Sequence, residues 1–365
     1  MAQRPESEIV ALLRELTLVP GPPGFEAAVR RVALDALQGV AGLKTSHDRL
    51  GSLIIEKTGG AATPRVVLDA HLDEIGFMVE TIRDDGMLSF VPLGGWWAHV
   101  LLAQRVDVIT EQGTVPGVFG SKPPHFLSGG DGDRVMKYEE IFIDVGAASR
   151  EEADGFGIRV GDFVVPHSEF MPFANPRILS SKAFDDRAGV GIMVEVLLAL
   201  SGVDHPNTVI GVGAVQEEVG IRGAVTAAAA SKPDVGIVLE GPPADDTPGI
   251  PASPRQGVMG KGPQVRLYDP TAISNRALAK LVQRVAEENQ IPIQLAVRRS
   301  GGTDARAIHM HEEGVPTVVI GVPSRYVHTH VSLIHLDDYL SSLRLIVELI
   351  KVLDGEAVRT FAPQT

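Results

Sequence analysis

The sequence contains no cysteine, few aromatic residues and no long apolar run. Because cysteine is absent, disulfide bonds and thiolate metal sites are excluded, and any metal must be held by His, Asp or Glu. Aromatic residues make up only 5% of the chain, which disfavours recognition of carbohydrate or single-stranded nucleic acid on aromatic platforms. No run approaches the roughly 20 apolar residues of a membrane span, and no signal-type apolar core opens the chain. We therefore expect a cytoplasmic protein.

Positive charge is also in deficit, with 33 Lys and Arg against 46 Asp and Glu, a net charge of −13. Nucleic acid and membranes are therefore unexpected partners, because an acidic surface releases no counterions from phosphates and is not attracted to anionic lipid. Peptides or small molecules fit better. The length of 365 residues exceeds one ordinary core and suggests two domains.

Short apolar runs alternate with amphipathic stretches over most of the chain. The runs predict strands at 53–56, 65–71, 208–215, 235–240, 292–297 and 317–322. The amphipathic stretches predict helices at 7–17, 26–37, 188–200, 223–231, 275–289, 300–313 and 336–353. This alternation is typical of an α/β fold, in which helices cover both faces of a mainly parallel sheet. We assign residues 1–76 and 173–365 to this domain.

Residues 77–172 have a different character. Short alternating runs, as at 105–110, 141–145 and 162–166, are separated by Gly, Pro and Asp turns. Apart from a short stretch near 149–153, no convincing helix is found there. This pattern predicts a small all-β unit. Because the α/β pattern resumes afterwards, we interpret the unit as an inserted domain.

Residues able to bind a metal follow four of the predicted strands. In open α/β sheets, ligands bind beyond the carboxyl ends of the strands. The polar residues at these ends, and at one nearby helix start, are His71, Asp73, Asp185, Asp186, Glu217, Glu218, Glu240 and His328. Two histidines with several carboxylates and no thiolate suit a dinuclear site for Zn²⁺, Co²⁺ or Mn²⁺.

Taken singly, these residues also have structural explanations. A His after a strand is often a hydrogen-bonded structural residue, and Asp185 and Asp186 could cap a helix. Glu217 and Glu218 could form a charged turn, and Glu240 could cap a loop. Their convergence on one edge of the sheet argues against a purely structural role for all of them. Of the two adjacent glutamates, one could bind metal while the other handles protons.

Seven motifs, in order along almost the whole chain, resemble the M42 family of dinuclear-metal aminopeptidases. They are Ala70-His-Leu-Asp-Glu-Ile-Gly-Phe, Gly117-Val-Phe-Gly-Ser-Lys-Pro-Pro-His, Ile143-Asp-Val-Gly-Ala-Ala-Ser-Arg, Ala183-Phe-Asp-Asp-Arg-Ala-Gly, Val215-Gln-Glu-Glu-Val-Gly-Ile-Arg-Gly-Ala, Gly301-Gly-Thr-Asp-Ala and Ser324-Arg-Tyr-Val-His. The resemblance implies a zinc-aminopeptidase-like fold whose insertion is a PDZ-like dimerisation domain of small β-barrel form. It also implies dimers that assemble into a tetrahedral dodecamer.

The resemblance further implies a ligand set for two divalent ions, Zn²⁺ or Co²⁺ with Mn²⁺ as a further possibility. His71 corresponds to the ligand of one ion and His328 to that of the other. Asp185 corresponds to the bridging carboxylate, with Asp186 as the alternative. Glu218 and Glu240 correspond to the remaining carboxylates. The family more often has Asp at the last of these positions, so the additional methylene makes metal binding there less certain.

The remaining roles concern protons and substrate. Glu217 corresponds to the general base, and Asp73 to the residue that fixes the tautomer of His71. Gly302, Thr303 and Asp304 could contact the N-terminus of a peptide, although a helix cap explains them equally well.

The sequence thus predicts a metal-dependent aminopeptidase that releases N-terminal residues from peptides by means of an activated water. A dinuclear carboxypeptidase or N-acyl amino acid deacylase would use the same ligands. A glycosidase could use two adjacent carboxylates but would leave the histidines without a role. An oligomeric scaffold with a vestigial metal site is the non-catalytic alternative.

Overall fold

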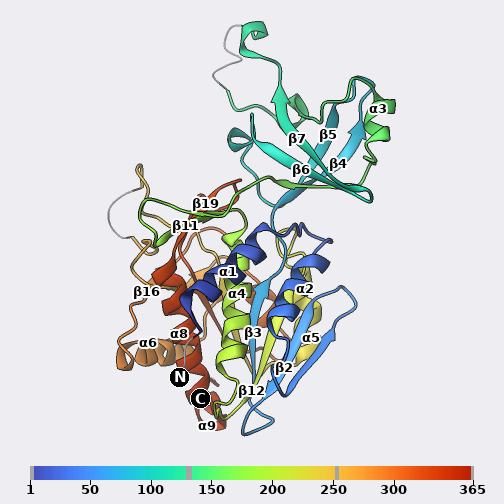
Figure 1. Ribbon diagram of the computed structural model, residues 1–365. Coiled ribbons are helices and arrows are strands. Elements are labelled where there is room, and N and C mark those ends of the chain that lie inside the picture. The colour runs from blue at the N-terminus through green and yellow to red at the C-terminus, as the bar shows by residue number, and fades with distance from the viewer. Residues whose placement is uncertain (1–3, 129–133, 251–254, 363–365) are drawn as a thin grey trace.

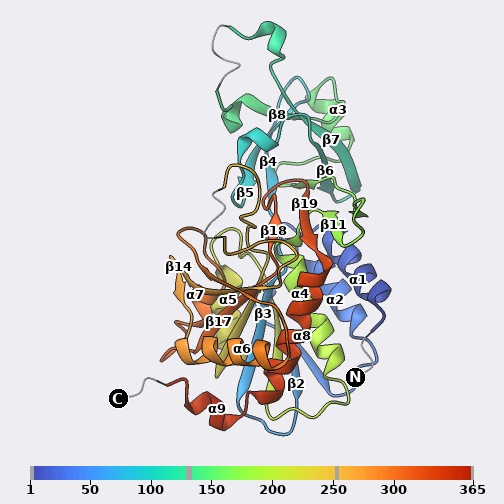
Figure 2. The ribbon, with the colours of Figure 1, turned by 90° about the vertical axis from the view of Figure 1, so that its left-hand side faces the viewer.

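The computed structural model describes residues 4–128, 134–250 and 255–362. Figure 1 shows a helix-covered sheet in the lower part of the molecule and a small barrel above it. Turned by 90°, the same two bodies remain stacked, with α9 (Gly355–Arg359) at the end away from the barrel (Figure 2). Among the described residues, no helix has the length and apolarity needed to cross a membrane.

The lower body is built on a nine-stranded mixed sheet. In spatial order its strands are β1 (Leu43–His47), β2 (Leu53–Thr58), β12 (Thr208–Ala214), β3 (Arg65–His71), β13 (Val235–Glu240), β17 (Thr317–Gly321), β14 (Gln264–Asp269) and β15 (Ala272–Ile273), with β16 (Gln294–Val297) paired to β14. The four central strands, β12, β3, β13 and β17, are parallel to one another. Their runs of Val, Ile and Leu are buried on both faces, as parallel strands require. The predicted parallel centre is confirmed.

Helices cover both faces of the sheet, as predicted. Alternate residues of β3 face opposite ways: Val66 and Leu68 belong to one apolar core, and Val67 to another. The larger core is closed by α1 (Glu6–Leu18), α2 (Ala27–Ala36), α4 (Phe184–Ala199), α6 (Arg276–Glu288) and α8 (Leu336–Val352). The smaller core is closed by α5 (Arg222–Ser231) and α7 (Ala305–Ile308).

The predicted helix at residues 300–313 is wrong for most of its length. Only Ala305–Ile308 is helical, and Gly301 and Gly302 precede it in irregular backbone. Glycine costs about 1 kcal/mol in a helix relative to alanine, so the two glycines favour a loop. After the single turn, Val315 N–H donates to the carbonyl of His309, which turns the chain into β17.

Several short elements had no prediction. A second, four-stranded sheet consists of β10 (Met171–Pro172), β11 (Ile178–Ser181), β19 (Ser332–His335) and β18 (Ser324–Arg325). Strands of two to four residues carry too little periodicity to be recognised. They form because segments far apart in sequence, such as Ile178–Ser181 and Ser332–His335, are brought into register.

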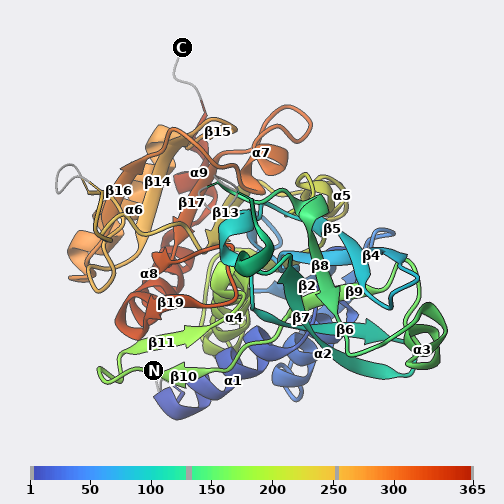
Figure 3. The ribbon, with the colours of Figure 1, turned by 90° about the horizontal axis from the view of Figure 1, so that it is seen from above.

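The upper body is a closed six-stranded barrel, which confirms the predicted all-β insertion. Around the barrel the strands are β4 (Gly76–Ile82), β5 (Leu88–Leu93), β8 (Ile141–Asp144), β7 (Gly113–Ser121), β6 (Arg105–Thr110) and β9 (Phe163–Pro166), accompanied by α3 (Arg150–Gly155), η1 (Ala98–Val100), η2 (Pro124–Phe126) and η4 (Tyr138–Glu140). Its interior is an aromatic cluster in which Phe77 contacts Phe90, Trp96 and Phe119. Seen from above, the barrel lies to one side and β14 and β16 to the other (Figure 3).

Candidate metal centre

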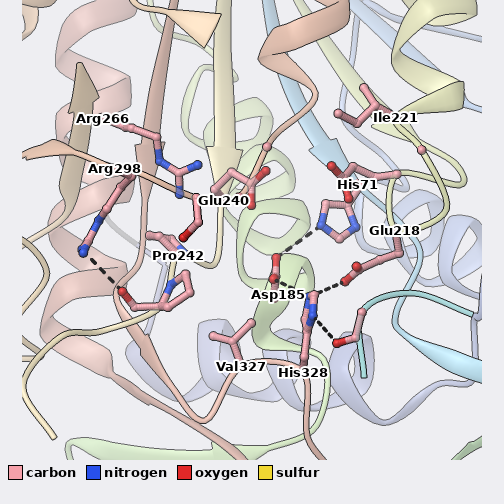
Figure 4. A pocket seen from close by; sticks show the side chains of 17 residues that line it. His71, Asp185, Glu218, Ile221, Glu240, Pro242, Arg266, Arg298, Val327 and His328 are labelled. Carbon is pink, nitrogen blue, oxygen red and sulfur yellow. Dashed lines mark hydrogen bonds and ion pairs between the residues drawn. The ribbon is translucent and has the colours of Figure 1, made fainter. Parts of the chain in front are cut away.

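The carboxyl ends of the central strands meet at one edge of the sheet, and several of the predicted residues gather there. His71 is the last residue of β3 and Glu240 the last of β13. Glu218 follows β12, whose Ala214 is in register with His71. Figure 4 shows these side chains converging, with His328, on Asp185.

Asp185 lies between the two histidines. Its Oδ1 is 3.3 Å from Nε2 of His71, and its Oδ2 is 3.6 Å from Nε2 of His328. The second histidine also contacts Oε1 of Glu218, at 3.1 Å from Nε2. Asp185 is able to face both rings because its backbone angles, φ −84° and ψ 106°, are not helical although it stands at the start of α4.

The ligand atoms form two groups that share one carboxylate. His71, Asp185 and Glu240 offer atoms within 4.8 Å of one another, and so do Asp185, Glu218 and His328. One carboxylate common to two such groups is the donor arrangement of a dinuclear centre, and imidazole with carboxylate suits Zn²⁺, Co²⁺ or Mn²⁺. The longer side chain of Glu240 therefore still reaches the first group.

The electrostatics of the cluster also suit a bound cation. Burial raises the pKa of Glu240 well above its usual range, and the charge of Asp185 raises it further. Burial alone would lower the pKa of His328, but contacts with Asp185 and Glu218 raise it to about 11. Without a metal, the carboxylates therefore stabilise protons on the imidazoles. A metal would supply the positive charge and leave the ring nitrogens free to coordinate.

Asp186 does not join either group. Its side chain is buried, Oδ1 accepts the N–H of Gly189, and Oδ2 has no hydrogen-bond partner among the described residues. Between the two adjacent aspartates, the geometry therefore favours Asp185 as the shared ligand.

Asp73 lies directly beneath the acidic loop. Its carboxylate accepts the backbone N–H of Glu217 at 2.9 Å and that of Glu218 at 3.0 Å. Nδ1 of His71 lies 3.0 Å from the main-chain carbonyl oxygen of Asp73, and 3.7 Å from its carboxylate. The expected contact with His71 is thus made by the backbone, while the side chain positions the two glutamates.

Glu217 lines the cavity, and its carboxylate has no hydrogen bond or ion pair to any described residue. Burial raises its pKa well above the ordinary value, and His71 opposes that effect. A carboxyl group that is held at a cavity wall without a structural partner is available for proton transfer.

Of the three residues suggested for peptide binding, only Gly302 is on the described cavity wall, beside Ser300 and Gly301. The hydroxyl of Thr303 accepts the N–H of Ala305, which is a helix-start contact. Asp304 is buried below the site, where burial and neighbouring Asp69 raise its pKa well above its usual range. The helix-cap explanation therefore fits Thr303. The carboxylate of Asp304 makes no cap hydrogen bond and has no hydrogen-bond partner among the described residues.

The cavity, of about 520 Å³, has further lining residues that sequence reasoning missed: Gly95, Gly220, Ile221, Pro242, Pro243, Arg266, Arg298 and Val327. Arg266 lies on β14 and Arg298 directly follows β16. Neither strand edge has a motif that points to a site. Only the pairing of β16 with β14, at the far side of β17, brings these arginines to the cavity.

Comparison with known proteins identifies the family. Residues 51–345 match the family model described as M42 glutamyl aminopeptidase. A putative aminopeptidase, FrvX, of Escherichia coli is 36% identical over 97% of this chain and 98% of its own length. A glutamyl aminopeptidase of Lactococcus lactis is 34% identical over 96% of this chain and 98% of its own.

Solved structures agree. A TET aminopeptidase from a marine sediment thaumarchaeote superposes with a TM-score of 0.95 at 43% identity, covering 98% of this chain and 99% of its own. The TET1 peptidase of Pyrococcus horikoshii, which assembles into a tetrahedron or an octahedral shell, superposes with a TM-score of 0.83 at 32% identity over 94% of this chain and all (100%) of its own. The chain belongs to the M42 peptidase family, and it is an aminopeptidase.

Proposed function

We propose that this aminopeptidase uses two divalent ions held by the residues gathered around Asp185. His71 and Glu240 would complete one site, and Glu218 and His328 the other. The observation that carries this proposal is the sharing of Asp185 between two groups of possible ligands. Zn²⁺ and Co²⁺ are the ions that fit this donor set best, with Mn²⁺ next.

When bound, such ions act as Lewis acids that polarise a carbonyl and lower the pKa of water. Glu217 would accept the proton of the attacking water and return it to the departing amine. Its carboxylate is suited to this because nothing among the described residues holds it and its loop is fixed from below by Asp73. Raising the pKa of a carboxylate brings it closer to the value that efficient proton transfer requires at neutral pH.

We also propose that the enzyme prefers peptides with an acidic N-terminal residue. Every acidic residue on the described cavity wall belongs to the metal centre or is Glu217. The opposite end, beyond Glu240, is occupied by Arg266 and Arg298 (Figure 4). A lysine side chain would find no free carboxylate at that end, whereas a glutamate would find two guanidinium groups.

Both arginines have N–H donors that are not used in hydrogen bonds to described residues. Arg266 donates to Asp269 at 3.1 Å, and Arg298 donates to Asp245 at 3.0 Å and to the carbonyl of Pro243 at 3.4 Å. Because guanidinium has five N–H donors, most of them have no protein acceptor among the described residues. The relatives' names do not decide this preference, because the Lactococcus relative is a glutamyl aminopeptidase and an equally identical relative from Pyrococcus furiosus is a lysyl aminopeptidase.

A panel of amino-acid anilides tests the preference. We expect kcat/KM to be higher for the Glu anilide than for the Leu or Lys anilides. In R298M, kcat/KM for the Glu anilide should fall by roughly 10–100-fold, which is the contribution expected of one charged hydrogen bond. The kcat/KM for the Leu anilide should change little. The matched control is R299M, because Arg299 is exposed and lies outside the cavity wall. A preference for Lys, or cleavage of N-acyl amino acids only, would contradict the proposal.

We further propose that the chain forms a homo-oligomer through the barrel, in the manner of the shell-forming relatives. The barrel presents large apolar side chains to solvent, among them Trp97 and Phe126, which are 62% and 68% exposed. Exposed aromatic residues are typical of interface cores. Light scattering should give a mass several times 38.8 kDa, and W97D combined with F126D should reduce it.

A further inference from the structure

The inserted barrel supplies a contact to the candidate metal centre itself. The loop after β5 carries Gly94, Gly95 and Trp96, and Gly95 lies on the cavity wall. The main-chain oxygen of Gly95 lies 2.8 Å from Nδ1 of His328, although the two residues are 233 positions apart in sequence. We propose that Gly95 is a positioning residue that fixes the tautomer and orientation of His328.

The chemistry of this contact defines the tautomer. A carbonyl oxygen can only accept a hydrogen bond, so Nδ1 of His328 must carry a proton. In the neutral ring Nε2 is then left with its lone pair, and Nε2 is the atom that faces Asp185 and Glu218. Metal-bound histidines need such a partner on the second nitrogen.

His328 depends on this contact more than His71 does. His71 ends a central strand, and its own Nδ1 faces the main-chain oxygen of Asp73 in the same segment. His328 lies in the irregular loop between β18 and β19, has a left-handed φ of 60°, and is 33% exposed at its side chain. No regular element holds it. The Gly95 carbonyl is the contact that reaches it from outside the ligand cluster.

The loop that carries the carbonyl is itself firmly held by the barrel. Trp96 donates from Nε1 to the carbonyl of Gly76 at 3.0 Å and stacks on Phe77 with ring centres 4.5 Å apart. Tyr138 donates its hydroxyl to the carbonyl of Trp96 at 2.6 Å. The barrel core therefore fixes the position of the loop that contacts His328.

Gly94 and Gly95 both lie close to neighbouring side chains. Gly94 has φ +92°, and a Cβ there would lie 2.4 Å from Cγ2 of Ile75. A Cβ on Gly95 would lie 3.2 Å from Nδ1 of His328, which is tighter than nine in ten real Cβ contacts. An alanine at Gly95 would therefore shift the imidazole of His328 by a few tenths of an ångström from its position against the carbonyl. The inserted barrel is in this way part of the catalytic site as well as a separate module.

The inference rests on the proposed role of His328 as a ligand, so the test includes both. Metal-free protein is titrated with Zn²⁺ against a chromophoric chelator, and ion content is measured by elemental analysis. We expect G95A to lower the affinity for one of the two ions by roughly 10–100-fold, the usual cost of losing such a partner. W96F should lower the affinity for the same ion. H328A should lose that ion entirely.

Two controls separate this effect from general destabilisation. W97F alters the neighbouring side chain, whose described ring contact is with His99. As a control, it should leave the affinity for both ions unchanged. V108A loosens the barrel core at β6, a strand that provides none of the loop's hydrogen bonds, so it should lower the melting temperature and leave both ions tightly bound. If H328A loses an ion while G95A and W96F bind both ions as the unchanged protein does, the positioning role is refuted. It is refuted equally if V108A weakens the binding of that ion as much as G95A does. If H328A retains two ions, the ligand proposal itself fails, and the inference with it.

Discussion

Replacing Glu217 with glutamine should separate catalysis from structure at this centre. The two side chains have the same shape, and the carboxylate has no hydrogen bond or ion pair to a described residue. Its backbone N–H, held by Asp73 at 2.9 Å, is unchanged by the substitution. No native contact is therefore lost in E217Q.

The expected effects follow from these contacts. Stability of the metal-free protein should not fall and should rise slightly. Burial disfavours the charge of Glu217, and Asp304, Glu218 and Asp73 repel it. Turnover should fall by roughly 10²–10⁴-fold, the usual contribution of a general base, which corresponds to about 3–5 kcal/mol in activation free energy. KM and ion content should stay close to those of the unchanged enzyme.

The assay combines three measurements on the same preparation: kcat and KM on the preferred anilide, ions per chain by elemental analysis, and urea unfolding of the metal-free protein. E218Q is the matched control, because Glu218 contacts His328 at 3.1 Å; it should lose metal together with activity. A near-normal kcat in E217Q, with full ion content, would refute the assignment of the base. Unfolding of E217Q at clearly lower urea would show that its carboxylate has a structural partner.

Three further outcomes are expected. H71A should bind one ion per chain instead of two, and elemental analysis that finds two would remove His71 from the ligand set. Treatment with a chelator should abolish anilide cleavage, and added Co²⁺ or Zn²⁺ should restore it; full activity of verified metal-free enzyme would exclude a metal-dependent reaction. R187M should lower the free energy of unfolding by about 3–5 kcal/mol, because the fully buried Arg187 donates to the carbonyls of Leu16 and Leu72 and lies 3.6 Å from Glu74. Urea unfolding measures this, with R284M at an exposed helix position as the control; equal losses in both variants would show that the buried contacts add nothing.

The central strands and most long helices could be predicted because the spacing of apolar residues that marks them is a property of the local sequence. The runs that end at His71 and Glu240 are apolar enough to be strands in any setting. The stretch predicted as a helix at 300–313 is helical only at Ala305–Ile308, because Gly301 and Gly302 favour a loop. The short strands β10, β11, β18 and β19 exist only through pairing and could not be read from sequence.

The candidate site divides in the same way. The sequence by itself determined which residues end the parallel strands, because a βαβ unit places those ends on one edge whatever the details of packing. It also determined, through its lack of cysteine, that nitrogen and oxygen ligands are the only choice.

Only the tertiary structure decided how these residues meet. It gave Asp185 a position between two histidines and removed Asp186 from that place, because backbone angles at a helix start decide where each side chain points. It also brought Arg298 from an edge strand, and the carbonyl of Gly95 from the barrel, to the same cavity. Such contacts join segments far apart in the chain. They depend on strand order and domain packing, which no local pattern of residues encodes.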